Sequence, residues 1–323
     1  MEFKTIIAQL ESGECMISNQ VSTPQVEHTT KNLVIFTVAA GLLLLTASVI
    51  FTPMILAIAA VSYVSAYIVE AGFAKFRKRP LDKAWFVTPM IFTLMLPPTA
   101  PLWMAAIGSS FGVFFGKAVF GGSGRNVFNP AVVGTLFLSF AFPPNMLTTW
   151  LNPVTNDVVS SATPLITLNR GIPFPYSFTE LLLGNTAGSI GETFRLGILV
   201  LGIVLIVLKI ADWRIPTFYL GTVFGLNLIG GLLLPGSFRD PVLSLLVGGL
   251  LFAAFFVATD PVSAPLKPSA KMIYGIGLGV ITVVIRNFAT FPEGIIFAVI
   301  IMNALSPMID NMLSKQKEEE ATQ

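Results

Sequence analysis

Residues 32–51 read NLVIFTVAAGLLLLTASVIF, twenty consecutive positions without a charged side chain. An α-helix rises about 1.5 Å per residue, so a helix of this length crosses the roughly 30 Å hydrocarbon core of a bilayer. Segments of this length and composition are typical of membrane-spanning helices. This stretch therefore predicts that the chain folds within a lipid bilayer.

Nine further apolar segments follow the first. We expect spans at roughly 53–70, 84–96, 101–119, 129–142, 196–210, 215–234, 241–258, 271–286 and 293–312. Three of these segments are short for a complete crossing. Short segments flanked by Pro and Gly indicate discontinuous helices that end near the middle of the membrane, although clipped ends would explain them equally well. The predicted fold class is an all-α polytopic membrane protein with about ten transmembrane helices.

The composition of the whole chain supports the membrane assignment and excludes several functions. Hydrophobic residues make up 54% and charged residues 11% of the 323 residues, and the mean hydropathy is +0.80. Soluble domains carry about 25% charged residues. The net charge of +2 gives no reason to expect a nucleic-acid partner. Cys15 and His28 are the only residues of their kinds, which argues against a disulfide framework, a cysteine-ligated cluster and a histidine metal site.

Lysine and arginine predict the orientation of the spans, because they concentrate on the cytoplasmic side. With a cytoplasmic N-terminus, fifteen of the 19 Lys and Arg residues fall inside and four fall outside. Residues 1–31 and 313–323 are then cytoplasmic tails, and 1–31 has no signal-peptide core. The long connection 143–195 is extracytoplasmic, and a loop of this length is usually functional or disordered.

An internal similarity predicts two related halves. The stretch PPTAPL at 97–102 resembles PVSAPL at 261–266, and each is followed by glycines four residues apart. Such glycines let helices approach closely. The halves would be five-helix repeats at 32–142 and 196–312, and an odd number of helices makes the second repeat inverted. Inverted repeats place a site or pathway at their interface, as in folds similar to urea transporters, although chance similarity of Pro-rich loops remains an alternative.

Three stretches carry a family resemblance. They are GGSGRNVFNPA at 121–131, DVVSSAT at 157–163, and ATDPVSA at 258–264 with FPEG at 291–294, MNA at 302–304 and Asp310. In this order the stretches resemble the RnfD and NqrB membrane subunits of redox-driven ion pumps. The resemblance covers nearly all of the chain from residue 32 onward. The length favours RnfD, because NqrB proteins look longer at the N-terminus.

The resemblance implies a covalent flavin. The family joins FMN by a phosphoester to the last Thr of a Ser/Thr-Gly-Ala-Thr motif, which is Ser160, Ser161, Ala162 and Thr163 here. Ser161 departs from the usual Gly. A Thr hydroxyl is a poor nucleophile without a base, so attachment should need a separate flavin transferase with FAD as donor. The loop 143–195 is polar and outside, as such an enzyme requires. A second, noncovalent flavin such as riboflavin is also implied.

The remaining candidate site residues have both a functional and a structural interpretation. Arg125, Asn126 and Asn129 could bind a flavin or a quinone-like group, but Asn-Pro at a helix start is more often a cap. Ionisable groups near the membrane are costly and often functional. The family's proposed ion pathway corresponds to Glu70, Asp260 and Asp310. Glu70 could instead pair with Lys75 or Arg77.

The resemblance implies a subunit that relays electrons from ferredoxin to NAD+ while Na+ or H+ is moved outward across a bacterial inner membrane. Such a subunit is inactive alone and would assemble with RnfA, RnfB, RnfC, RnfE and RnfG. One alternative is an NqrB-like subunit of a Na+-translocating NADH:quinone reductase. Another is a small-solute channel or transporter without redox chemistry.

Overall fold

The computed structural model describes residues 30–151, 158–159, 165, 176–234, 238–289 and 293–321, with side chains within residues 31–314. The elements up to residue 159 are α2 (Thr30–Ile50), α3 (Met54–Phe76), α4 (Val87–Leu94), α5 (Leu102–Val113), the π-helix η1 (Phe114–Ala118), α6 (Pro130–Ala141), α7 (Pro143–Leu147), β1 (Trp150–Leu151) and β2 (Val158–Val159). The later elements are α9 (Phe178–Leu183), α10 (Arg195–Val207), α11 (Arg214–Leu233), α12 (Pro241–Leu246), α13 (Leu250–Phe252), the π-helix η2 (Ala253–Val257), α14 (Pro268–Phe288) and α15 (Ile295–Ala321).

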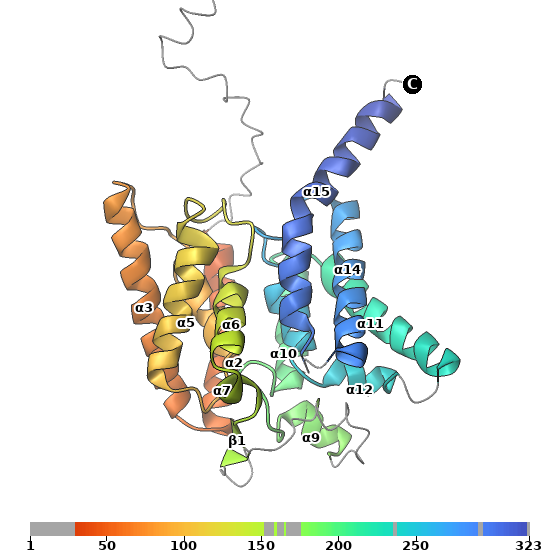
Figure 1. Ribbon diagram of the computed structural model, residues 1–323, viewed down its shortest axis with the longest axis horizontal. Coiled ribbons are helices and arrows are strands. Elements are labelled where there is room, and N and C mark those ends of the chain that lie inside the picture. The colour runs from red at the N-terminus through yellow and green to blue at the C-terminus, as the bar shows by residue number, and fades with distance from the viewer. Residues whose placement is uncertain are drawn as a thin grey trace, which may run out of the picture.

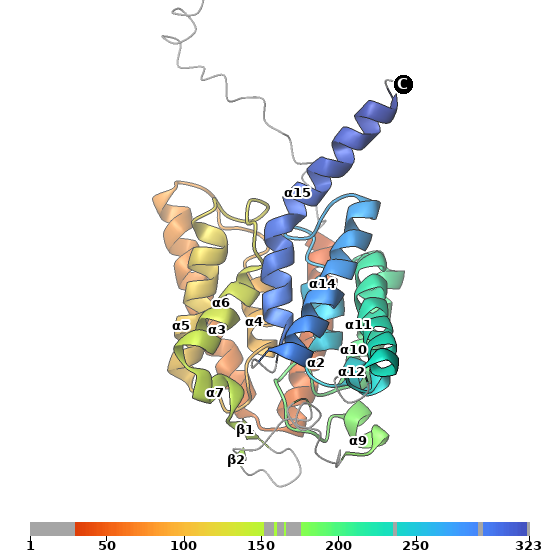
Figure 2. The same ribbon diagram turned by 45° about the vertical axis from the view of Figure 1, so that its right-hand side comes forward.

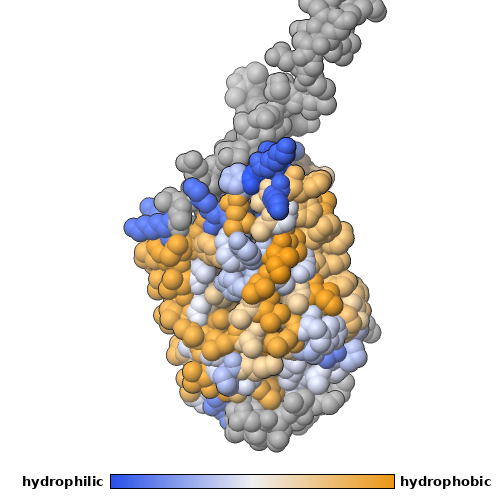
Figure 3. Space-filling model, turned by 90° about the vertical axis from the view of Figure 1, so that its left-hand side faces the viewer, coloured by the Kyte–Doolittle hydropathy of each residue, from blue (hydrophilic) through white to orange (hydrophobic). Residues whose placement is uncertain are grey.

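Helix length and surface confirm an all-α polytopic membrane protein. Five helices are long and apolar enough to cross a bilayer: α2, α3, α11, α14 and the Ile295–Ser314 part of α15. Three shorter apolar helices accompany them, at Leu102–Ala118, Pro130–Ala141 and Arg195–Val207. Large apolar side chains such as Val49, Ile68 and Leu232 are exposed, and Figure 3 shows apolar surface over the middle of one side. So broad an apolar surface indicates contact with lipid rather than with water.

One of the ten expected spans is short and another is interrupted. The span expected at 84–96 is the helix α4, which has eight residues and is followed by a loop up to Pro101. The segment 241–258, expected as one span, breaks at Val247–Gly249 between α12 and α13, which corrects that expectation. Gly248 has a φ of +73°, a conformation that side chains with a Cβ rarely adopt. Irregular backbone is tolerated at membrane depth where protein groups satisfy it.

The helices form two groups that lie side by side. Figure 1 shows α3, α5 and α6 on one side and α10–α15 on the other, and in the view of Figure 2 α2 lies behind α14 of the second group. The rings of Phe36 in α2 and Phe256 in η2 are 5.7 Å apart, and those of Phe140 in α6 and Phe297 in α15 are 5.8 Å apart. We call the end that carries α7, β1 and α9 the loop face. The opposite end, beyond which α15 extends, is the tail face (Figure 1).

Glycines allow the close helix approach that the sequence predicts. A Cβ on Gly112 of α5 would lie 2.4 Å from the carbonyl oxygen of Pro130, where α6 begins. A Cβ on Gly279 of α14 would lie 2.5 Å from Cβ of Thr222 in α11. The two sets of glycines thus face non-equivalent neighbours, since α6 is the helix after α5 whereas α11 precedes α14. The glycine spacing therefore identifies tight packing in each half without by itself establishing a repeat.

Gly112→Ala should destabilise the protein. The added methyl group has no room against the backbone of α6, and overpacking typically costs about 1–3 kcal/mol. Gly72→Ala in α3 is the matched control, because nothing lies within 4 Å of a Cβ there. Thermal unfolding in detergent should show a lower midpoint for Gly112→Ala and an unchanged or higher one for Gly72→Ala. Equal midpoints would contradict the close α5–α6 contact.

Candidate functional site

The predicted flavin attachment segment lies between two anchored stretches on the loop face. Its four residues are outside the described part of the chain: Ser160, Ser161, Ala162 and Thr163. Immediately before them, β2 pairs antiparallel with β1, with Val159 opposite Trp150. Shortly after them, Leu165 is 2% exposed and forms a buried cluster with Leu181 and Val247. Described residues on both sides of the segment, Val159 and Leu165, are thus held by contacts.

The Arg125–Asn129 motif builds the start of α6. Asn129 accepts a hydrogen bond from the N–H of Ala131 at 3.0 Å, so it caps the helix as the sequence favours. Its side-chain amide also reaches the carbonyl oxygen of Val257 at 3.5 Å, in the other helix group. Asn126 is buried and donates to the backbone two residues further on. These amides have structural partners already.

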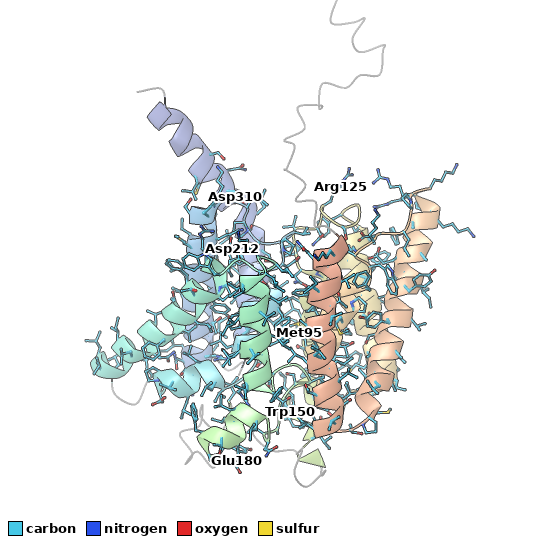
Figure 4. All side chains as sticks on the ribbon, turned by 180° about the vertical axis from the view of Figure 1, so that it is seen from behind. Met95, Arg125, Trp150, Glu180, Asp212 and Asp310 are labelled. Carbon is cyan, nitrogen blue, oxygen red and sulfur yellow. The ribbon has the colours of Figure 1, made fainter. Side chains whose placement is uncertain are left out.

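Arg125 and the strand β1 lie at opposite ends of the molecule. Figure 4 shows Arg125 at the tail face and Trp150, the partner of β2, at the loop face. The predicted attachment residues follow β2 in the sequence but lie outside the described residues.

Glu70 forms an ion pair with Lys117, a residue far from it in the sequence. The Nζ of Lys117 in η1 lies 2.5 Å from Glu70 Oε1 and 2.6 Å from Asp82 Oδ2, and Ser123 donates to Asp82. Burial alone would raise the pKa of the Asp82 carboxyl, but the charge and hydrogen bond of Lys117 outweigh burial and hold that pKa below its ordinary value. The expected alternatives Lys75 and Arg77 do not form this pair. Two carboxylates therefore share one buried ammonium.

Asp260 and Asp310 bracket the loop before α14. Asp260 accepts hydrogen bonds from the Ser263 hydroxyl at 2.8 Å and from the N–H of Val262 at 3.3 Å. Asp310 accepts from the N–H groups of Leu266 and Lys267 at 2.9 and 3.2 Å. Both carboxylates thus satisfy backbone groups that no helix satisfies. Figure 4 places Asp310 at the tail face.

The sequence interpretation missed a cluster nearer the loop face. Glu192 is 6% exposed and Arg195 is 1% exposed, although both were expected in a solvated loop or at its edge. The segment before them enters the protein: the N–H groups of Ile190 and Gly191 donate to carbonyl oxygens just after and at the end of α4, at 2.9 and 2.7 Å. A signal was present, because Glu192 and Arg195 are the only charged residues between positions 180 and 209.

Two buried arginines hold the interruption between α12 and α13. Arg195 donates to the carbonyl oxygens of Leu246, Leu181 and Thr193 and to the Thr186 hydroxyl. Arg286 donates to the carbonyl oxygens of Ser244 and Val247 at 3.0 and 3.1 Å. Both guanidinium groups thus satisfy carbonyl groups at the end of α12. Both arginines are among the four charges expected outside, and the structure shows that both are buried.

Two narrow cavities lie beside this interruption, between the helix groups. One has a volume of about 40 Å³ and the other of about 30 Å³. The residues that line both are Met95, Ser189, Glu192, Glu293 and Ile296. The larger one also reaches Thr135 and Ser139 of α6, and Trp150 and Leu165 at the loop face. A water molecule needs about 10–15 Å³ of such space. The cavities therefore have room for water or a small ion and not for a flavin or a quinone.

Known proteins resemble this chain over most of its length. Residues 17–318 match the family described as NQR2, RnfD, RnfE. The chain is 39% identical over 272 residues to the NqrB subunit of the Na(+)-translocating NADH-quinone reductase of Ectopseudomonas mendocina, covering 79% of this chain and 65% of that protein. It is 39% identical over 271 residues to the NqrB subunit from Azotobacter vinelandii, covering 80% and 66%. For the NqrB subunit from Klebsiella pneumoniae the identity is 37% over 274 residues, covering 78% and 65%.

The chain thus spans about 65% of the length of the curated relatives it matches. Their names describe subunits of a redox-driven, ion-translocating complex, and those relatives carry the NqrB name within the pair that the sequence motifs suggested. The matched region, residues 17–318, includes every described helix except the last three residues of α15. The chain belongs to the NQR2, RnfD, RnfE family.

Proposed function

We propose that this chain is the flavin-carrying membrane subunit of a Na+-translocating complex of the NADH-quinone reductase type. The observation that carries the proposal is the 37–39% identity over more than 270 residues to NqrB subunits of that reductase. This choice reverses the preference for the Rnf-type reading, which had rested on chain length. The second candidate is a subunit of an Rnf complex with RnfA, RnfB, RnfC, RnfE and RnfG, because the family description includes RnfD and RnfE.

Covalent FMN at Thr163 belongs to this proposal. A transferase would pass the FMN part of FAD to the Thr163 hydroxyl, forming a phosphoester and releasing AMP. Bound flavin can accept two electrons and pass them on singly, which suits a relay between other cofactors. The segment fits such a group because it is a short polar stretch between β2 and Leu165. These anchors would limit how far the attachment point can move from the loop face.

The residues that would serve ion movement form two clusters. Asp260 and Asp310 hold the loop before α14, and Glu70 shares Lys117 with Asp82 within the first helix group. In the proposed orientation the tail face and both termini are cytoplasmic, and the loop face lies outside a bacterial inner membrane. A second flavin such as riboflavin would bind in the assembled complex, where other subunits complete its site.

The electron donor and acceptor separate the two candidates. We expect a complex purified through a tag on this chain to reduce quinone with NADH and to do so faster when Na+ replaces K+. Ferredoxin-dependent reduction of NAD+ without quinone reduction would instead support the Rnf candidate. The absence of any redox activity in a complex that transports a solute would overturn both and favour a channel or transporter.

A further inference from the structure

We propose that Glu192 and Glu293 form a Na+ site at the junction of the two helix groups, a role that rests on the proposed ion translocation and adds residues to it. The carboxylates come from segments about one hundred positions apart in the sequence. A Cβ on Gly249 would lie 3.2 Å from Glu192 Oε2 and 3.9 Å from Glu293 Oε1. The two carboxylates therefore flank one point of the backbone, and both line both cavities.

Each carboxylate is held in place through one oxygen. Ser189 donates its hydroxyl to Glu192 Oε2 at 3.1 Å, and the N–H of Gly249 donates to Glu293 Oε1 at 3.2 Å. In the described part of the chain the second oxygen of each group, Glu192 Oε1 and Glu293 Oε2, has no hydrogen-bond donor. An ionised oxygen facing an apolar surrounding costs several kcal/mol unless water or a cation meets it. Each carboxylate that lines the cavities thus keeps one oxygen with free acceptor capacity.

The neighbouring arginines offset the charge without occupying the site. Arg195 and Arg286 give the four-residue group a formal net charge of zero, but their guanidinium groups bind carbonyl oxygens at the end of α12. Among the described residues, no Lys or Arg nitrogen lies within 4 Å of either glutamate carboxylate. A charge-balanced site binds a cation less tightly than two isolated carboxylates would. Weak binding suits a transport site, because the ion has to leave again.

The chemistry of the lining favours a monovalent cation. Hydroxyl oxygens of Thr135, Ser139 and Ser189 join the carboxylates around the larger cavity, and oxygen ligands suit hard cations. Within the described residues no third His, Cys, Asp or Glu side chain joins the two carboxylates in a metal-binding group. The space admits an ion with a few waters. The smaller cavity reaches Val257, three residues before Asp260.

Ion binding can be measured on the full chain in detergent, without its partner subunits and their own ion sites. The probe is NaCl against choline chloride at equal ionic strength, and the readout is the thermal midpoint, since a ligand that binds only the folded state raises it. We expect Na+ to raise the midpoint of the wild type and to have no such effect on Glu192→Gln or Glu293→Gln. Glu180→Gln is the matched control: it lies on α9 at the loop face, and Gln can keep the Ser177 capping box.

An equal Na+ shift in Glu192→Gln, Glu293→Gln and the wild type would overturn the proposal, as would a wild type that does not respond to Na+. A response only to pH, unchanged by Na+, would assign the pair to protons and would also overturn it. If Gln variants do not fold, Glu192→Asp and Glu293→Asp keep the charge and should weaken the Na+ response about tenfold or more through the lost methylene reach. A Na+ shift in a chain whose complex has no NADH-driven quinone reduction would leave the site standing and overturn the proposed function alone.

Discussion

Thr163→Ala should abolish covalent flavin on this chain. In the proposed chemistry the Thr163 hydroxyl is the only atom that can form the phosphoester, and alanine has no such atom. The chain should be coexpressed with a flavin transferase and digested, and the peptide that contains position 163 should be weighed. We expect the wild-type peptide to carry the mass of an FMN ester and the variant peptide to be unmodified, with loss of in-gel flavin fluorescence.

Two neighbouring changes control for the sequence context. Ser161→Gly restores the residue that is usual in the family motif and should leave modification equal or more complete. Ser160→Ala removes a second hydroxyl and should leave the ester at Thr163, which distinguishes the attachment atom from its neighbours. An unmodified wild-type peptide together with a modified Ser161→Gly peptide would mean that the Ser161 departure blocks the transferase. If neither is modified, the covalent flavin is absent from this protein.

Thr163→Ala should also stop quinone reduction by the complex. Electron transfer through the bound flavin would stop in Thr163→Ala, so quinone reduction by the complex should fall to background while the helices fold normally. The nearest described side chain after the motif, Leu165, is buried with Leu181 and Val247 and does not depend on the flavin. A normal thermal midpoint with no covalent flavin would therefore separate a missing cofactor from a misfolded chain.

The parts of the fold that could be predicted from sequence are those set by local chemistry. A charge-free stretch such as 32–51 forms a long helix because it can bury its backbone polar groups only by bonding them internally. Asn129 before Pro130 caps α6 because its side chain reaches the first free N–H groups. The glycines of α5 and α14 mark tight contacts because no other residue leaves the backbone so accessible.

The parts that could not be predicted depend on contacts between distant segments. The stretch 241–258 is as apolar as a continuous span, but it is interrupted where Arg195 and Arg286, from distant segments, bind its carbonyl groups. The pairing of Glu70 with Lys117 crosses 47 positions and needs the packing of α3 on η1. From the sequence alone, Glu192 belongs to a polar loop. Its burial follows only from the backbone hydrogen bonds that join its segment to the end of α4.

Arg195→Met should destabilise the protein strongly. The guanidinium group is almost fully buried and donates to three carbonyl oxygens and one hydroxyl, at 2.7 Å for Leu181 and 3.1 Å for Thr186. Met has a similar length and no donors, so these acceptors would remain buried without partners. Each such loss costs about 1–3 kcal/mol, which places the total among the most severe single substitutions. A large fall in the thermal midpoint in detergent is the expected result.

Arg214→Met is the matched control, because Arg214 also begins a helix but its side chain is 29% exposed and its ion pair is with Asp212 at 3.2 Å. Partly exposed pairs contribute about 0–1 kcal/mol, so this variant should unfold close to the wild-type midpoint. Arg195→Lys should fall between them, since one ammonium group cannot reach acceptors on α9, α12 and the 186–193 segment together. If Arg195→Met is as stable as Arg214→Met, the interruption between α12 and α13 is held by packing alone. The arginine would then serve mainly to balance the charge of Glu192.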